Sequence, residues 1–337
     1  MTDDEVLAHR LAERDVEFKH RLMELELAIT GIEPVGADPR APAHGTKAFI
    51  DSMAGADFDG IAGVIQAVHS AGYAIVPDFL NNAEIESLRH DLDPLFEAIK
   101  VLFDKTDERR ALFEGKQTLH IQNVLAKTDA ADAIATKQHL RAILCGILGH
   151  DYVFNAGAVA MSPDPGCAPQ GLHRDDGFFA LIPRPHLPLV VTAAIALDDF
   201  HPDNGSTQII PGSHLWRAER HPEPHEIQPV EMPAGSLLLW DGALYHGGGG
   251  NKTERTRRTL TFNYTRGWLR TQYNQYLSIP RERVLGMPPE LQSDLGYHRS
   301  ALGLGGCDQT DPLRYLEALQ ARGGDGQQPG LGRESQR

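Results

Sequence analysis

Short β-rich runs separated by turn residues occupy the chain from about residue 152 to residue 264, and this pattern restricts the fold more than any other feature. The runs are Tyr152–Met161, Leu189–Leu197, Thr207–Ile210, Glu226–Glu231, Ser236–Trp240 and Thr259–Tyr264. In the last run, Leu260, Phe262 and Tyr264 alternate with polar residues, which is the period of a strand with one buried face. We therefore expect a mainly β fold with flanking helices, a double-stranded β-helix of the jelly-roll or cupin-like barrel type.

The residues ahead of these runs predict the helices that support the barrel. The spacing of apolar residues indicates helices over Ile61–Ala71 and Lys137–Leu148. Strands are expected over Gly72–Pro77 and over residues 117–125. Asn82 is placed to cap a further helix, because an Asn side chain can accept hydrogen bonds from the first free N–H groups of a helix.

We divide the chain of 337 residues into three parts. Residues 1–45 are expected to form an N-terminal helix and a linker, and residues 322–337 a disordered tail. Residues 46–321 are then a single jelly-roll domain with its supporting helices. The N-terminal helix suits either internal packing or a contact between the two copies of a homodimer.

Two imidazoles and one carboxylate, those of His173, Asp175 and His246, are the residue types that suit a divalent iron. If His173 and Asp175 lie on one strand, they point the same way while Arg174 points elsewhere, because side chains alternate along a strand. No Cys accompanies them, which argues against a structural zinc site. Three ligands on one face leave the opposite face of the metal open. Arg257, eleven residues after His246, offers a guanidinium for the far carboxylate of a keto acid.

The segment 152–268 resembles the phytanoyl-CoA dioxygenase family of Fe(II)/2-oxoglutarate-dependent oxygenases. The matching stretches are Leu172–Asp175, Asp203–Thr207, Pro211–His214 and the residues from His246 through Asn251 to Arg257. Gly72–Leu80 is similar to the usual opening of the family, so the resemblance extends over about residues 60–280. His214 suits either a group that supports the metal ligands from behind or a surface residue of the turn after Pro211 and Gly212, and we favour the surface residue.

The resemblance implies a set of cofactors and the residues that bind them. The implied Fe(II) ligands are His173, Asp175 and His246. Arg257 is implied to bind the C5 carboxylate of 2-oxoglutarate, and Thr207 and Gln170 to contact the same cosubstrate. With O2, such an enzyme hydroxylates, desaturates or cyclises a small organic substrate and releases succinate and CO2. Halogenases related to the family lack the carboxylate, so the presence of Asp175 disfavours halogenation.

Two other arginines, Arg255 and Arg258, compete with Arg257 for the cosubstrate. Arg257 shares a strand face with Thr259 and Thr261, whereas Arg258 shares one with apolar residues. A polar face suits the interior of an active site, so we expect Arg257 to be the cosubstrate residue. By the same period of two, Thr192 and Ala194 are expected to face the barrel interior.

The substrate is not specified by the sequence. Phe178, Phe179, Leu181 and Ile182 suit either an apolar entrance to the site or the core, and Trp268–Arg270 with Tyr273–Tyr276 resemble the family members that act on secondary metabolites. Three alternatives stay open: a non-catalytic metal- or ligand-binding jelly roll, an acyl-CoA hydroxylase, and an Fe(II) dioxygenase that needs no keto acid. The glycines of Gly247–Gly250 do not form a phosphate loop, because Asn251 rather than Gly precedes Lys252.

Charge and composition limit the partners. The net charge of −14 opposes binding to nucleic acid, which requires basic surface. No run approaches 18 apolar residues, and the acidic start, Met1–Glu5, lacks the apolar part of a signal peptide. The three cysteines form neither a disulfide framework nor a zinc pattern. We expect a cytoplasmic protein with a small-molecule substrate and with neither a nucleic-acid nor a membrane partner.

Overall fold

The structure of the chain, a computed structural model, describes residues 58–102, 117–300, 303–308 and 310–321. The expected N-terminal helix and linker (residues 1–45) and the expected tail (322–337) lie outside the described residues. The helices are α3 (Phe58–Ala71), α4 (Asn82–Leu102), α6 (Asp132–Ala135), α7 (Gln138–Leu148), α8 (Gln275–Ser278), α9 (Arg281–Leu285), α10 (Pro289–Asp294) and α11 (Pro312–Ala321). The strands are β1 (Tyr73–Val76), β2 (Thr118–Ile121), β3 (Tyr152–Pro163), β4 (Val190–Ala196), β5 (Thr207–Ile209), β6 (Gln228–Pro229), β7 (Leu237–Asp241), β8 (His246–Gly248) and β9 (Thr259–Arg266).

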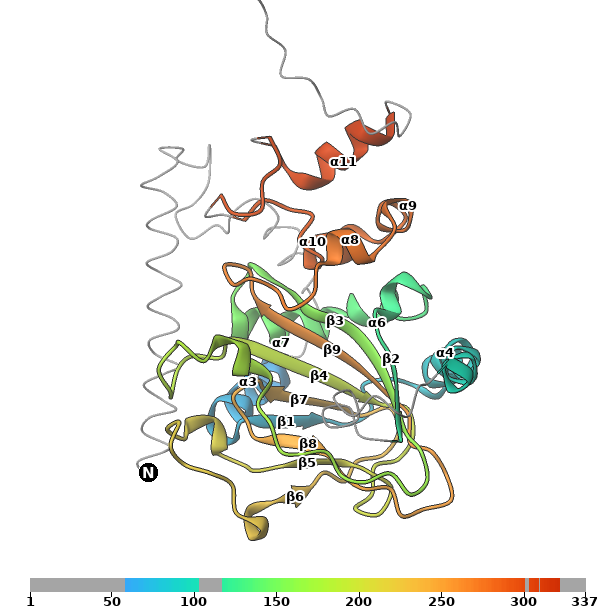
Figure 1. Cartoon of the computed structure of the whole chain (residues 1–337). Coiled ribbons are helices and arrows are strands. Elements are labelled where there is room, and N and C mark those ends of the chain that lie inside the picture. Colours follow the sequence, from blue (N-terminus) through green and yellow to red (C-terminus); the bar gives the residue numbers. More distant parts are fainter. Residues whose placement is uncertain (1–57, 103–116, 301–302, 309, 322–337) are drawn as a thin grey trace, which may run out of the picture.

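The strands form two antiparallel sheets. The larger has six strands in the order β1-β7-β4-β9-β3-β2, and the smaller has three in the order β6-β5-β8. In Figure 1 the smaller sheet lies below the larger one, and the helices surround the larger. This is the predicted mainly β jelly roll with flanking helices. Backbone hydrogen bonds among the described residues join the strands as two sheets and not as one continuous ring.

The two faces of the large sheet pack against different partners because side chains alternate along each strand. On β4, Val191, Ala193 and Ile195 join the large core beneath the helices, whereas Ala194 and Ala196 join a smaller core that includes Ile209 of the small sheet. On β9, Leu260, Phe262 and Tyr264 also join the large core, as their period of two predicts. The other face of β9 carries the polar residues Thr259, Thr261, Asn263 and Thr265, which lie on the side of the small sheet.

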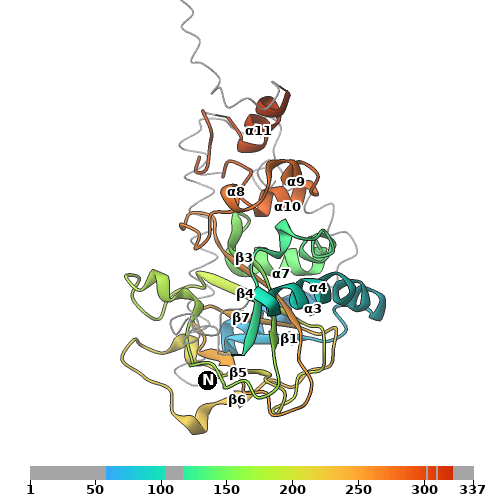
Figure 2. The ribbon, with the colours of Figure 1, turned by 45° about the vertical axis from the view of Figure 1, so that its right-hand side comes forward.

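Helices α3 and α7 contact each other and strands of the large sheet, and α4 contacts β2. Figures 1 and 2 place α8, α9, α10 and α11 together beyond one end of the sheet, in a C-terminal group that the strand pattern did not predict. Across the described ranges, no helix combines the length and the apolar character that crossing a membrane requires.

Several predicted boundaries are wrong for local reasons. The cap of α4 is Asn81, not Asn82: the Asn81 Oδ1 accepts hydrogen bonds from the N–H groups of Ala83 (2.9 Å) and Glu84 (3.1 Å). The Glu84 carboxylate in turn accepts from the Asn81 N–H, which completes a capping box. The run predicted over Glu226–Glu231 contributes only the two-residue strand β6.

His214 is buried and is not the surface residue that its turn suggested. Its Nε2 donates to the carbonyl of His69 at 3.0 Å, and its Nδ1 has no hydrogen-bond partner among the described residues. A side chain on Gly72 would come within 2.6 Å of that Nδ1, so the ring is closely packed. Burial lowers the pKa of His214 to about 4, because a charged imidazole would lose its hydration there.

We expect His214 to make the fold sensitive to acid. The unfolded imidazole takes up a proton near pH 6.5 and the folded one only near 4, so the stability that neutral His214 confers is lost as pH falls through this window. Relative to His214→Gln, the wild type should lose about 2 kcal/mol more of its unfolding free energy between pH 7 and pH 5. Urea unfolding at the two pH values measures this difference, and equal losses in both proteins would contradict the assignment.

Candidate metal centre

A reciprocal pair of backbone hydrogen bonds brings His173 and His246 together. The His173 N–H donates to the His246 carbonyl at 2.9 Å, and the His246 N–H donates to the His173 carbonyl at 3.0 Å. His246 is the first residue of β8, while His173 lies outside the named strands in an isolated antiparallel pair. Because directly paired residues present their side chains on the same face, the two rings lie 4.4 Å apart between centroids.

Asp175 reaches the same place, but not by the predicted route. It begins a short 3-10 helix, Asp175–Phe179, so His173 and Asp175 do not share a strand. Arg174, between them, keeps an extended backbone (φ −124°, ψ 131°), so the side chains of His173 and Asp175 still point to the same side. Arg174 points elsewhere, as expected, with its guanidinium 4.1 Å from the Tyr245 ring centroid and a hydrogen bond to the Ser213 carbonyl.

The three side chains converge with their metal-binding atoms facing one another. Asp175 Oδ1 lies 3.4 Å from His246 Nε2 and 3.8 Å from His173 Nε2, and the three ligand atoms all lie within 4.8 Å of one another. With metal–ligand bonds of about 2.1 Å, neighbouring ligands of an octahedral ion are about 3 Å apart, so the trio could hold a metal after small adjustments. Within the described part of the chain, this is the group of His, Cys, Asp and Glu residues that could do so.

Backbone carbonyls set the tautomer of both imidazoles. His173 Nδ1 lies 3.0 Å from the Gly171 carbonyl, and His246 Nδ1 lies 3.0 Å from the Leu244 carbonyl. A carbonyl only accepts, so each Nδ1 carries the hydrogen and donates it. The lone pair of each Nε2 is then directed toward the shared point, which is the arrangement that metal-binding histidines require.

The Asp175 carboxylate is held from two strands of the large sheet. Its Oδ2 accepts hydrogen bonds from the Thr192 hydroxyl of β4 at 2.6 Å and from the Trp240 indole of β7 at 3.1 Å. Burial alone would raise the pKa of this carboxyl, but His246, His173 and the Thr192 hydrogen bond outweigh burial and lower the pKa below its usual value. Asp175 is therefore ionised at neutral pH, as a metal ligand must be.

The pKa values of the imidazoles reflect their different surroundings. Burial and the neighbouring His246 lower the pKa of His173. Burial also acts to lower the pKa of His246, but the close Asp175 carboxylate more than offsets this effect and raises it. A metal ion bound at the His246 Nε2 would replace the proton there and would be attracted by the Asp175 carboxylate in the same way.

Arg257 is buried two residues before β9 and forms no ion pair among the described residues. Its Nη2 donates to the Gly205 carbonyl, and its guanidinium lies 4.1 Å from the Phe200 ring centroid. Its Nε and Nη1 have no hydrogen-bond partner among the described residues. Burial lowers the pKa of Arg257 to about 10, so the side chain stays cationic at neutral pH. Such a group is suited to an incoming carboxylate.

The two competing arginines have other roles. Arg258 forms hydrogen-bonded ion pairs with Asp198 and with Asp93, at 2.8 to 2.9 Å. Arg255 is exposed to solvent. Arg257 is therefore the arginine of the three that lies on the inner, polar face, as the alternation with Thr259 predicted.

Gln170 and Thr207 both lie beside β8. The Gln170 Oε1 accepts a hydrogen bond from the Gly248 N–H at 2.7 Å, and the Gln170 N–H donates to the Gly248 carbonyl at 2.8 Å. Thr207 begins β5 and pairs with Gly248 from the other side. Both residues are half-buried.

The glycine run beside His246 permits close backbone contacts. A Cβ on Gly249 would come within 2.7 Å of the Ser206 carbonyl, and one on Gly248 within 3.1 Å of the Gln170 Oε1. A Cβ on Gly250 would meet the Cys167 carbonyl at 3.2 Å. These glycines let the end of β8 pass closely between the segments of Ser206 and of Cys167–Gln170. This close packing accounts for the glycine run, so phosphate binding is not needed to explain it.

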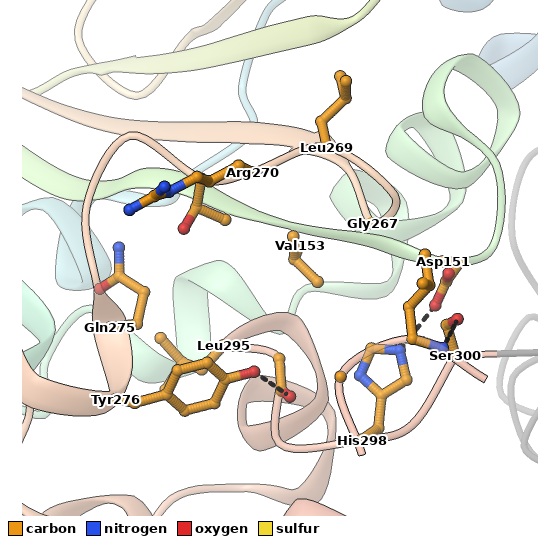
Figure 3. Close-up of a pocket in the computed structure, with 14 residues that line it drawn as sticks. Asp151, Val153, Gly267, Leu269, Arg270, Gln275, Tyr276, Leu295, His298 and Ser300 are labelled. Carbon is orange, nitrogen blue, oxygen red and sulfur yellow. Dashed lines mark hydrogen bonds and ion pairs between the residues drawn. The ribbon is translucent and has the colours of Figure 1, made fainter. Parts of the chain in front are cut away.

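Exposed apolar side chains follow Asp175 along the chain. Phe178 is 64% exposed and Leu181 is 99% exposed. This exposure excludes core packing for both and favours the expected apolar entrance. A separate cavity of about 220 Å³ lies at one end of the large sheet. Figure 3 shows Val153, Gln275 and His298 in its walls.

Comparison with known proteins gives the family. The phytanoyl-CoA dioxygenase (PhyH) family matches residues 68–259, more than half of the chain. Dioxygenase swnH2 of Arthroderma benhamiae is 30% identical over 277 residues, which cover 76% of this chain and 87% of that protein. Dioxygenase olcK of Penicillium canescens is 29% identical over 242 residues, 69% of this chain and 80% of that protein.

Solved structures are similar at lower identity. HygX from Streptomyces hygroscopicus, with nickel and 2-oxoglutarate bound, gives a TM-score of 0.49 at 18% identity, over 63% of this chain and 89% of that one. The non-heme alpha ketoglutarate dependent epimerase SnoN from nogalamycin biosynthesis gives 0.47 at 20% identity, over 62% and 84%. The resemblance predicted from the sequence is confirmed by the family match and by the curated dioxygenases: this chain belongs to the phytanoyl-CoA dioxygenase family.

Proposed function

We propose that this protein is an Fe(II)/2-oxoglutarate-dependent dioxygenase in which His173, Asp175 and His246 hold the iron and Arg257 anchors the cosubstrate. The observation that carries the proposal is the pairing of two features in one interior. Three metal-binding groups lie within 4.8 Å of one another, and a buried guanidinium carries two N–H groups without partners among the described residues.

The donor set fits a divalent iron. Two imidazole nitrogens and one carboxylate oxygen are the ligands of the facial triad, and no described Cys joins them. Both imidazoles donate from Nδ1 to a backbone carbonyl, so Nε2 is the nitrogen that a metal would bind, in place of a proton on His246, and the carboxylate is ionised. The trio therefore requires little reorganisation to accept the ion.

The surroundings of Arg257 fit a dicarboxylate. A buried cation without a counter-charge is costly, and a carboxylate can satisfy both unpartnered N–H groups with two parallel hydrogen bonds. Phe200 fixes the plane of the guanidinium and the Gly205 carbonyl fixes its Nη2. Gln170 and Thr207, on either side of Gly248, are the further cosubstrate contacts that we propose.

Bound Fe(II), together with 2-oxoglutarate and O2, supplies the oxidation of the substrate and yields succinate and CO2. The protein orients these groups and excludes water. The ring of Trp240, 4.8 Å from that of His246, shields one side of the metal residues. Phe178 and Leu181 offer an apolar surface to a small organic substrate such as a secondary metabolite, which is hydroxylated, desaturated or cyclised.

Loss of His246 should abolish tight binding of a divalent cation. Titration of the metal-free protein with Mn(II), followed by calorimetry, should give one site in the wild type and at least a ~100-fold weaker one in His246→Ala, because a three-ligand site then has two ligands. The exposed His225, changed to Ala, is the matched control and should bind as the wild type does. Equal affinities in all three proteins would refute the proposed metal centre.

Loss of Arg257 should selectively weaken the binding of the cosubstrate 2-oxoglutarate. We expect Arg257→Ala to raise the KM for 2-oxoglutarate by ~30-fold or more, since removing one partner of a buried charge pair costs about 2 kcal/mol or more. The exposed Arg255→Ala is the control. Succinate formation in air measures the effect. If Arg257→Ala kept its KM, the enzyme would not use Arg257 for a keto acid.

The substrate class can be tested without knowing the compound. Incubation with a panel of apolar natural-product cores, Fe(II), 2-oxoglutarate and O2, followed by mass spectrometry, should reveal products that have gained one oxygen or lost two hydrogens. Phe178→Asp should reduce turnover of an active compound while leaving 2-oxoglutarate affinity unchanged, because only the apolar entrance is altered. Unchanged turnover would remove Phe178 from the substrate path.

A further inference from the structure

We propose that Thr192 and Asn263 are positioning residues that hold the Asp175 carboxylate so that it binds iron through Oδ1 alone. The inference rests on the proposed iron site and adds residues that do not bind the metal themselves but orient one of its ligands. Neither Thr192 nor Asn263 belongs to the metal trio; both face the polar interior between the sheets.

The first observation is a continuous chain of hydrogen bonds that ends on Asp175. The Asn155 Nδ2 donates to Asn263 Oδ1 at 2.8 Å, and the Asn263 Nδ2 donates to the Thr192 hydroxyl at 2.7 Å. The Thr192 hydroxyl then donates to Asp175 Oδ2 at 2.6 Å. The chain starts on the backbone, where the Gln272 N–H donates to Asn155 Oδ1 at 2.8 Å.

All of these bonds run in one direction, toward the carboxylate. A hydroxyl has a single hydrogen, so accepting from Asn263 leaves the Thr192 hydrogen available for Asp175. Without the Asn263 amide, the Thr192 hydroxyl could rotate toward another acceptor. Bonds arranged in series also polarise one another, which strengthens the last one.

The second observation is the unequal treatment of the two carboxylate oxygens. Oδ2 receives the Thr192 and Trp240 hydrogen bonds, whereas Oδ1 faces the imidazoles at 3.4 and 3.8 Å. Two donors occupy Oδ2, so Oδ1 is the oxygen that would bind a metal. A carboxylate that binds through one oxygen leaves more coordination positions for 2-oxoglutarate and O2 than one that binds through both.

An irregularity in β3 gives the chain its starting point. The register between β3 and β9 shifts between Phe154 and Gly157, which turns the Asn155 side chain toward Asn263. The Asn155 carbonyl also accepts from the Tyr273 N–H at 3.1 Å. Asn155 is thereby fixed to the segment that leads into α8, whose first residue, Gln275, lies on the wall of the cavity in Figure 3.

Burial protects two members of the chain from competing water, and Asn263 between them is half-buried. Asn155 is 1% exposed and Thr192 is 4% exposed. The Asn263 Oδ1 accepts a second bond, from the Ala156 N–H at 3.3 Å, so its amide cannot turn over without losing partners. The network is therefore satisfied and ordered before any metal arrives, as a positioning device must be.

The test measures metal binding without catalysis. Ni(II) is titrated into metal-free wild type, Thr192→Val, Thr192→Ser and Asn263→Leu, and thermal unfolding of each metal-free protein checks its fold. We expect Ni(II) to bind ~10-fold more weakly to Thr192→Val and to Asn263→Leu, the size typical for removing a partner of a metal ligand. Thr192→Ser keeps the hydroxyl and should remain within about 2-fold of the wild type.

The matched control is Thr265→Val, because Thr265 lies on the same face of β9 but donates to the Leu189 carbonyl at 2.8 Å, outside the chain. It should keep the wild-type affinity. The combined Thr192→Val, Asn263→Leu protein should bind no more weakly than either single variant, since both act through the same bond. In the Co(II)-loaded proteins, the visible absorption of Thr192→Val should change in intensity, which reports an altered coordination number.

The outcomes separate this inference from the proposed function. A wild type that binds no Ni(II) would refute the metal centre itself. A wild type that binds Ni(II), with Thr192→Val and Asn263→Leu binding equally well and with an unchanged Co(II) spectrum, would refute the positioning role alone. Fully additive losses in the combined variant would show that the two residues act separately, which also overturns the proposal.

Discussion

The site depends on two backbone hydrogen bonds between residues that lie 73 positions apart in the chain, His173 and His246. Each donates its N–H to the carbonyl of the other, and this pairing sets the distance between their imidazoles before any metal is considered. Their Nδ1 atoms are fixed by local carbonyls, so the orientation of both rings follows from the backbone. Only Asp175 requires side-chain partners to reach its place.

Those partners explain why the space between the sheets is polar where β4 and β9 meet. An apolar core would be simpler to pack, and buried polar groups are tolerated only when they are satisfied. Here Thr192 and Asn263 satisfy one another and Asp175. Arg257 differs, because part of its hydrogen-bonding capacity has no described protein partner. Hydrogen bonding is thus complete around the carboxylate and incomplete around the guanidinium, which suits the proposed roles of Asp175 as a fixed metal ligand and of Arg257 as the residue that binds an exchanging cosubstrate.

The sequence predicted the elements whose pattern is local. The alternation along β9 identified its inner face and separated Arg257 from Arg258. Predictions from local pattern were wrong where contacts between distant parts of the chain determine the conformation or burial of a residue. Asp175 leaves the extended conformation for a 3-10 turn. His214 is buried because it packs on Gly72 and on the helix that carries His69.

Two other features had no signal in the sequence. The group of helices from α8 to α11 consists largely of short segments, for which apolar periodicity is a weak guide. The chain of hydrogen bonds from Asn155 through Asn263 to Thr192 joins three strands. Single Asn and Thr residues within strands form no sequence pattern from which such a network could be predicted. The family resemblance brought together three residues that the structure places within 4.8 Å of one another, because its motifs encode contacts that spacing alone does not; their role as iron ligands stays a prediction.

The exposed apolar side chains that follow Asp175 belong to a segment that is anchored at both ends. Asp175 is gripped from the sheet, and next to it Asp176 forms ion pairs with Arg184 and His186 further along. Between these anchors, Phe178 and Leu181 project into solvent. In the proposed enzyme, substitutions in this loop would change the surface offered to a substrate while the positions of His173, Asp175 and His246 stay the same, because none of their hydrogen bonds comes from Phe178 or Leu181.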